Sequence, residues 1–412
     1  MPTGFAPFSN LSQELVEEIV DALVDTQESD LHISNLCACA LVCRSFRHRA
    51  QKYIFYSMTL LGLKTEANCR ERVDSFHEIL QKNPRIASYI RRLRFDMDDT
   101  AKWVFEDPLL LQIMELVTKT WVVGTKLELS IFAWSEDFHF TDNRTFETRF
   151  VKPFVTPFIT SLDLHYVYDV PLTLFSHCPH LVDLSLIWVT VEASPRFNVI
   201  AVDQSLRSRP HKFTFQSLDS SFRALSATCI DFSHLQYLSA SGYLSDEIPD
   251  LNFILEASSS SLKCLELEFD ELEGHLSTVW DLSRIPNLTQ LTLSMVNLDT
   301  VDDEDPFADL CNLLRTTCSE KTKINTIALG FMGKLDASWK LSAYLEKLET
   351  GRPLSTVLAK IAEKKPLEVK IRLDLTAEAE RIEELETWIA DNSRLMRKLS
   401  PNVSQEYDYK LH

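Results

Sequence analysis

Histidine and carboxylate side chains that could perform acid–base catalysis are scattered along this chain rather than grouped. His139 lies near Asp137 and Asp142, and His165 follows Asp163. In a chain with 60 acidic residues, such neighbours are expected by chance. The sequence contains neither Gly-x-Ser-x-Gly nor His-Glu-x-x-His, the motifs that place a nucleophile or a metal beside a base. We therefore expect that the chain is not an enzyme and has no catalytic residues.

Metal and cofactor sites are not expected from the sequence either. Cys37, Cys39 and Cys43 cluster, but no Cys-x-x-Cys or histidine pair completes a zinc-like set. The chain has only eight glycines and lacks both common phosphate-binding glycine motifs. Because such loops need glycine so that the backbone can approach phosphate, nucleotide-dependent chemistry is disfavoured. We expect no metal and no cofactor.

The bulk composition is that of a globular protein. The chain has 412 residues, of which 45% are hydrophobic and 25% are charged, which allows two or three domains. There is no run of eighteen apolar residues and no basic segment followed by an apolar segment at the N-terminus. We therefore expect no membrane span, no secretory signal, reduced cysteines and a cytoplasmic or nuclear location, or both.

The elements near the N-terminus are predicted to be helices. Leu11, Leu15, Ile19 and Leu23 recur every four residues with a valine after each of the last three, which predicts one helix with a wide apolar stripe. Asn10 together with Gln13, or Ser12 alone, could cap its first turn. A second helix should carry Leu36, Ala40, Leu41 and Val42, and a third should cover residues 46–55. About fifty residues cannot bury so much apolar surface alone, which indicates a docking module that completes its core against a partner or the rest of the chain.

This N-terminal pattern resembles the F-box motif over roughly the first sixty residues. The matching positions are Leu11, Glu14, Leu15, Ile19, Leu23, Leu36, Val42, Cys43, Arg44 and Phe46. Ser12 replaces the usual proline, and the connection from Leu23 to Leu36 is longer than usual. The resemblance implies binding to a Skp-type adaptor through Leu11, Glu14, Leu15, Ile19, Leu23, Leu36, Leu41, Val42, Cys43 and Phe46. The alternative is an ordinary helical hairpin at the start of a domain.

A repeated phrase, Leu-x-x-Leu-x-Leu, organises the rest of the chain. It begins at Leu181, Leu262 and Leu288, and weaker copies begin at residues 90, 159, 235 and 324. Further strands are expected at 127–132, 212–215 and 367–375, with helices opened by Asp107-Pro108 and Asp305-Pro306 and others near 341–348 and 357–361. The starts at 235, 262 and 288 are 27 and 26 residues apart, as in leucine-rich repeats.

The predicted fold class is therefore α/β, with three N-terminal helices followed by an irregular leucine-rich-repeat solenoid. Its parallel strands would line the concave side and its helices would lie outside. The predicted domains are an F-box-like domain at 1–60, a solenoid at 61–375 and a C-terminal part at 376–412. That last part should begin with a capping helix opened by Thr376 and end in a loosely ordered tail. A doubly wound sheet of another kind is the alternative.

Acidic residues are concentrated in the second half of the chain. The formal net charge is −18, and residues 241–310 contain sixteen acidic and two basic residues, a balance of −14. Charge of this sign repels phosphate backbones, so we expect no nucleic-acid partner. Glu266, Glu268 and Asp270 are candidates for contact with a basic protein substrate. A solvated acidic surface without a partner is the alternative interpretation.

Taken with the resemblance, these patterns suggest a substrate receptor of a cullin-based ubiquitin ligase. The N-terminal helices would bind the adaptor, through it the cullin scaffold, and the solenoid would bind a protein substrate for ubiquitin conjugation. One alternative is a leucine-rich-repeat scaffold without a ligase role, whose N-terminal helices cap the solenoid. A weaker one is an α/β-hydrolase-like enzyme with an unrecognised site.

Overall fold

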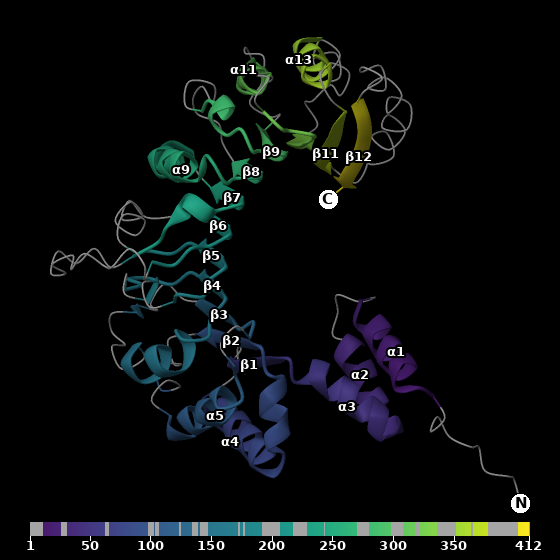
Figure 1. The fold of residues 1–412 in the computed structure, drawn as a ribbon, viewed down its shortest axis with the longest axis vertical. Helices are drawn as coiled ribbons and strands as arrows, with labels where there is room; N and C mark the ends of the chain where they lie inside the picture. Colours follow the sequence, from purple (N-terminus) through teal and green to yellow (C-terminus); the bar gives the residue numbers. More distant parts are fainter. Residues whose placement is uncertain are drawn as a thin grey trace, which may run out of the picture. The chain divides into compact units, whose positions relative to one another are not determined.

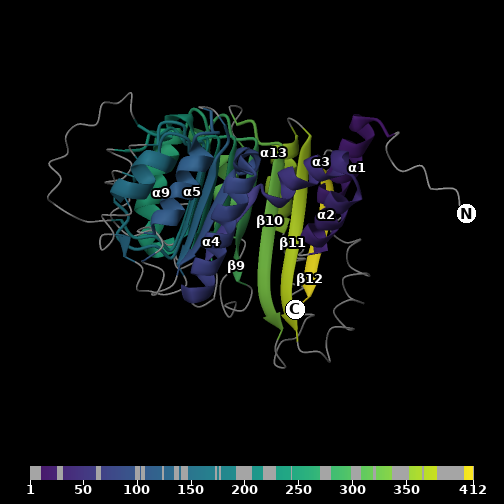
Figure 2. The same ribbon diagram turned by 90° about the horizontal axis from the view of Figure 1, so that it is seen from below.

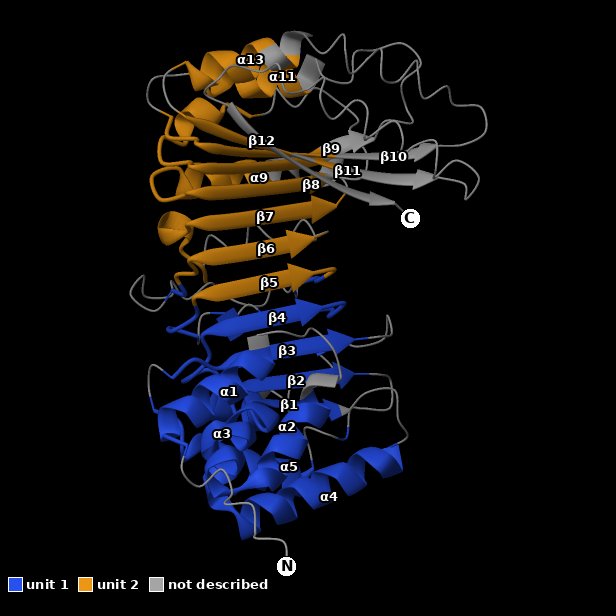
Figure 3. Cartoon of the chain, turned by 90° about the vertical axis from the view of Figure 1, so that its right-hand side faces the viewer, with its two compact units in different colours: residues 1–181, 189–208 blue, residues 182–188, 209–412 orange. Residues whose placement is uncertain are grey.

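The computed structural model divides into two compact units, residues 1–181 with 189–208 and residues 182–188 with 209–412 (Figure 3). The residues that it describes are 11–25, 31–61, 66–97, 103, 107–122, 125–133, 139–140, 147–171, 174–175, 178–191, 207–216, 229–242, 244–269, 280–297, 308–318, 322–335, 352–363, 366–377 and 403–411. We call the two parts unit 1 and unit 2 and describe each by itself. No helix in the described ranges is both long and apolar enough to cross a membrane.

Unit 1 begins with the three expected helices, α1 (Gln13–Asp25), α2 (Leu31–Val42) and α3 (Arg44–Ile54) (Figure 1). Ser12 caps α1, because its Oγ accepts a hydrogen bond from the backbone N–H of Leu15 at 3.3 Å. At the end of α2, the carbonyl oxygen of Ala40 accepts a hydrogen bond from Arg47 Nε at 3.1 Å. Ser12 therefore helps to set the start of α1, and Arg47 of α3 helps to satisfy the end of α2.

The rest of unit 1 alternates strands and helices. The strands are β1 (Ser57–Leu61), β2 (Arg92–Met97), β3 (Glu128–Ala133) and β4 (Ser161–His165), and each pairs in parallel with the next. Between them lie α4 (Glu66–Lys82), η2 (Pro84–Tyr89), α5 (Pro108–Thr118) and the π-helix η5 (Glu147–Val155). As predicted, Asp107 and Pro108 open α5, and Asp107 accepts hydrogen bonds from the backbone N–H groups of the first turn. Strand β1 was not predicted.

Unit 2 contains eight parallel strands paired in chain order within the described residues. They are β5 (Asp183–Ile187), β6 (Lys212–Gln216), β7 (Tyr237–Gly242), β8 (Cys264–Phe269), β9 (Gln290–Asn297), β10 (Thr326–Leu335), β11 (Leu367–Ala377) and β12 (Val403–Leu411). The helical segments between them are η7 (Phe232–His234), α9 (Leu244–Ser258), η8 (Leu282–Arg284), α11 (Ala308–Thr316) and α13 (Arg352–Ala362). Figure 2 shows β10 and β11 running side by side in one direction. The α/β class and the parallel pairing are as predicted, and strands joined by helical segments are consistent with a solenoid-like arrangement.

The leucine phrase builds the core of unit 2. In β8, Leu265 and Leu267 are buried, whereas Glu266 between them is partly exposed, because successive side chains of a strand point to opposite faces. The first leucine of the phrase, Leu262, is buried in the turn before the strand. The next copy repeats this burial at Leu288, Leu291 and Leu293, so each repeat adds one layer to a continuous apolar core.

The C-terminal part departs from the prediction. Thr376 lies in β11 instead of opening a helix, and Val403–Leu411 forms β12, paired in parallel with β11. The expectation of a loosely ordered tail was therefore wrong for these residues. A physical reason is that the edge of β11 offers a row of backbone donors and acceptors, which an extended segment satisfies. The other residues of the predicted capping helix, the helix near 341–348 and the Asp305-Pro306 cap lie outside the described residues.

Candidate protein-interaction site

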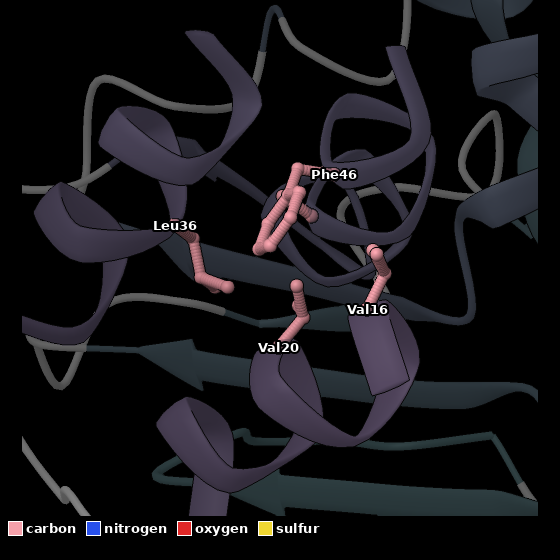
Figure 4. Packing of buried hydrophobic residues seen from close by; sticks show 5 residues of the cluster. Val16, Val20, Leu36 and Phe46 are labelled. Carbon is pink, nitrogen blue, oxygen red and sulfur yellow. The ribbon is translucent and has the colours of Figure 1, made fainter. Parts of the chain in front are cut away.

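The three N-terminal helices enclose a small core of their own. Its buried members come from all three helices and are Val16, Val20, Leu36, Phe46 and Ala50 (Figure 4). Partly buried side chains at its margin include Leu11, Val24, Cys39, Ala40, Cys43, Tyr53 and Ile54. Two residues assigned to adaptor contact by the resemblance are thus internal, since Leu36 is 0% and Phe46 is 6% exposed. A partner cannot reach them while the helices are folded, so their role is to hold the helices together.

A second set of apolar side chains on the same helices is exposed. On α1, Leu15 and Ile19 are 47% and 43% exposed, one position before the buried Val16 and Val20. One position corresponds to about 100° around a helix, so the wide stripe of α1 divides into an inward valine row and an outward Leu15–Ile19 row. The exposed large hydrophobic residues of α2 are Ile33, Leu41 and Val42. We call these three, together with Leu15 and Ile19, the apolar docking surface.

The other predicted contact residues are exposed or partly buried in the same N-terminal segment. Glu14 is exposed on α1, and Leu11 and Leu23 are partly buried. Cys43 is also partly buried and precedes α3, where its carbonyl oxygen accepts a hydrogen bond from the N–H of Arg47 at 2.9 Å. Ile33 was not predicted, because its neighbours in the sequence show no helical stripe that would single it out.

An ion pair fixes α1 against α3. Arg49 donates to both carboxylate oxygens of Asp21, from Nε at 2.8 Å and from Nη2 at 2.6 Å. The hydroxyl of Tyr53 donates to the same carboxylate at 2.8 Å, and Glu17 lies 3.8 Å from Arg49 Nη1. The hydrogen bonds from Arg49 lower the pKa of Asp21, and burial together with the Asp21 hydrogen bond raises the pKa of Tyr53. This bidentate ion pair helps to determine that the Leu15–Ile19 row of α1 faces outward.

The face of α3 toward η2 is also occupied. The rings of His48 and Tyr89 make an edge contact with centroids 6.0 Å apart, and Arg85 donates a hydrogen bond to His48. Burial, and secondarily the charge of Arg85, lower the pKa of His48. This contact connects α3 to the first turn after α4 within unit 1.

In unit 2, Glu266 lies on β8 between the buried Leu265 and Leu267, and Glu268 follows Leu267 on the same strand. In the strand register, Glu266 lies between Ser239 of β7 and Thr292 of β9, and Glu268 is exposed. The carboxylate of Glu266 accepts a hydrogen bond from the Tyr237 hydroxyl. Burial and this carboxylate raise the pKa of Tyr237.

Two other groups of the same segment, Cys264 and Asp250, are partly or fully buried. Burial and the charge of Glu266 raise the pKa of Cys264 to about 11. Asp270, the third candidate, lies outside the described residues. Asp250 is buried, so this part of the acidic segment does not add to an acidic surface.

The histidine pairs bridge segments within unit 1. A hydrogen bond of 2.8 Å joins His165 to Asp163. The ring of Phe132 stacks on that of His165, with the two ring centroids 4.1 Å apart. His139 is hydrogen-bonded to Asp169 at 2.7 Å, whereas its sequence neighbours Asp137 and Asp142 are outside the described residues. Across the described part of the chain, no group of three or more His, Cys, Asp or Glu side chains could hold a metal ion. Cys37, Cys39 and Cys43 are free thiols.

Comparison with known proteins found no match for this chain. No protein-family model matches it, and no curated protein and no solved structure is significantly similar to it. The function of the chain is therefore inferred from its own residues and their geometry.

Proposed function

We propose that the chain is the substrate receptor of a cullin-based ubiquitin ligase. In this proposal α1–α3 bind a Skp-type adaptor, and the leucine-rich strands hold a protein substrate. The observation that carries it is the apolar docking surface, which remains exposed although Val16, Val20 and Leu36 already complete a core. Partners perform the ubiquitin chemistry, and this chain contributes proximity and orientation.

The exposed apolar area of these side chains provides a driving force for binding a partner. Fully burying a leucine or isoleucine side chain contributes roughly 1.5–3 kcal/mol. Leu15 and Ile19 are about half exposed and Leu41 is 80% exposed, so covering each contributes roughly 1–2 kcal/mol. Exposed apolar side chains of this kind are typical of protein interfaces, where a few side chains carry most of the affinity.

Co-purification with a Skp-type adaptor tests the adaptor half of the proposal. Replacing Leu15 and Ile19 with aspartate should abolish capture of the adaptor, because two carboxylates would be buried without partners. The matched control is Ile79→Asp, since Ile79 is 38% exposed on α4 and lies outside the docking surface. Equal capture by the double variant and the control, with the helices still folded, would rule out docking through this surface.

The substrate half of the proposal depends on Glu266 and Glu268. We expect them to bind a basic segment, so Glu266→Lys with Glu268→Lys should abolish substrate capture and leave adaptor capture unchanged. Glu363→Lys is the matched control, because Glu363 is exposed at the end of α13. Substrate capture that does not weaken with added salt would contradict this role.

A scaffold without a ligase role is the second candidate, favoured by the contact of His48 with Tyr89 and Arg85. In that case α1–α3 serve as an N-terminal cap for the strands of unit 1. Deleting residues 1–54, which removes α1–α3 and leaves β1 intact, separates the two functions. A cap predicts faster hydrogen exchange in β1–β3 and no loss of partners, whereas a receptor predicts loss of the adaptor.

A further inference from the structure

A polar pocket of about 400 Å³ lies at the N-terminal ends of strands β7 to β10 in unit 2. In Figure 3 this is the edge from which the arrows of β7, β8 and β9 start. Four successive turns line it, with His234, Gln236, Ser260, Ser261, Lys263, Asn287, Thr289 and Lys323. Its size is within the range of small-ligand sites in proteins.

We propose that this pocket binds a phosphate group. Its lining is unusual for an acidic chain, since none of its eight side chains is a carboxylate and two are lysines. Lys263 is one of only two basic residues in the segment 241–310. The positive charge at this edge is therefore local, and the acidic remainder of the segment 241–310 would not attract an anion to it.

Both lysines are held by neutral partners. Lys263 Nζ donates to Gln236 Oε1 at 3.0 Å, and Lys323 Nζ donates to Asn287 Oδ1 at 2.8 Å. An amide oxygen orients an ammonium group without cancelling its charge. Because each ammonium has three N–H donors, two from each lysine remain for a ligand.

Hydrogen bonds between repeats hold the pocket in shape. Asn287 Nδ2 donates to the carbonyl oxygen of Ser260 at 2.6 Å, and Thr289 Oγ1 donates to that of Lys263 at 3.0 Å. Ser261 Oγ donates to the carbonyl oxygen of Leu235 at 2.7 Å. The lining is thus preorganised, which reduces the entropy lost when a ligand binds.

The number of donors favours an oxyanion with several terminal oxygens over a carboxylate, since the two lysines alone leave four N–H groups for a ligand. Lys263 and Lys323 approach from turns that precede β8 and β10, and the amides of Gln236 and Asn287 lie beside them. A phosphate group has three terminal oxygens that accept charge-assisted hydrogen bonds from several directions at once. The same group could be carried by inorganic phosphate or by a phosphorylated side chain.

Calorimetric titration of the full-length chain tests this site. The probes are inorganic phosphate, O-phosphoserine and acetate, each compared with sodium chloride at equal ionic strength. We expect saturable binding of phosphate, weakened about tenfold or more by Lys263→Met and by Lys323→Met, since each removes a charged donor but keeps the apolar stem. Lys360→Met, at an exposed position of α13, should bind phosphate like the parent chain.

The probes also separate the two sources of the phosphate group. Tighter binding of phosphoserine than of phosphate identifies a modified side chain as the ligand, and equal binding identifies the free ion. Absence of saturable phosphate binding in the parent chain would overturn the proposal, whether or not the variants fold. Acetate binding as tight as phosphate, or variants that bind like the parent, would overturn it too. None of these outcomes depends on the adaptor or the substrate.

Discussion

Leu36 and Leu41 allow the same substitution to be compared in one helix in opposite environments. Both lie on α2, but Leu36 is 0% and Leu41 is 80% exposed. Leu36→Ala removes three buried carbons, about 2.4 kcal/mol of transfer free energy, and leaves a cavity, so a total loss of about 3–5 kcal/mol is expected. Leu41→Ala removes only about a fifth of that transfer term, roughly 0.5 kcal/mol, and creates no cavity. The higher helix propensity of alanine offsets part of this smaller loss.

The assay must report on α1–α3 alone. A chain with two compact units does not unfold in a single transition, so a global melting curve would mix several events. Hydrogen–deuterium exchange of peptides from α1, α2 and α3 measures local opening instead. Leu36→Ala should speed exchange there by about a hundredfold to a few thousandfold, and Leu41→Ala by no more than about threefold.

Adaptor capture completes the comparison. Leu41→Ala should weaken capture by about tenfold while the exchange rates of α1–α3 stay near those of the parent. Similar exchange rates in the two variants would refute the division into core and docking surface. Undiminished capture by Leu41→Ala would refute the contribution of Leu41 to docking but leave the core assignment intact.

Three further predictions concern single contacts. Asp21→Asn should destabilise α1–α3 by about 1 kcal/mol or less, since the pair with Arg49 is partly solvent-exposed. Folding lowers the pKa of Asp21, so the stabilisation from this carboxylate is full above its unfolded pKa near 3.9 and is lost as the pH falls through the lower folded value. Hydrogen exchange of α1–α3 measured from pH 6 to pH 3 should show this loss of stability for the parent chain and not for Asp21→Asn. Asp107→Ala should cost about 1–2 kcal/mol and raise exchange in the first turn of α5, because a helix cap is lost, and unchanged exchange would contradict the cap. Gly330→Ala would place a Cβ 2.5 Å from the Ser294 Oγ and should lower the stability of unit 2 to heat by about 1–3 kcal/mol. Adding Ser294→Gly should restore part of this stability, and a double variant as unstable as Gly330→Ala alone would refute the clash.

Periodicity predicted most elements but could not assign the two sides of α1. The apolar stripe of α1 is wider than one contact face, and the pattern does not say whether the valine or the leucine row faces inward. That choice depends on Leu36 and Phe46 filling the space beside the valines. It also depends on the Arg49–Asp21 pair, whose members are 28 residues apart. Local periodicity carries no information about contacts of that separation.

Strand β12 was missed although a weak local signal exists. Val403, Tyr407, Tyr409 and Leu411 fall on alternate positions, as in a strand, but the polar residues between them favoured a tail. Its pairing depends on the free edge of β11, a property of the assembled sheet. No local sequence pattern predicts the polar pocket, because Lys263 and Lys323 are separated in the chain by strands β8 and β9. They come to line one pocket only when those strands have paired.

Within each unit, strands pair in chain order, and this order also describes how the protein can be made. Each strand that leaves a ribosome finds the edge of its predecessor already available, so folding can proceed from the N-terminus without waiting for distant segments. The shared apolar core of α1–α3 is complete by Ile54. We expect these helices to fold first during translation, and the apolar docking surface to be accessible on the nascent chain before the strands of unit 2 have been synthesised.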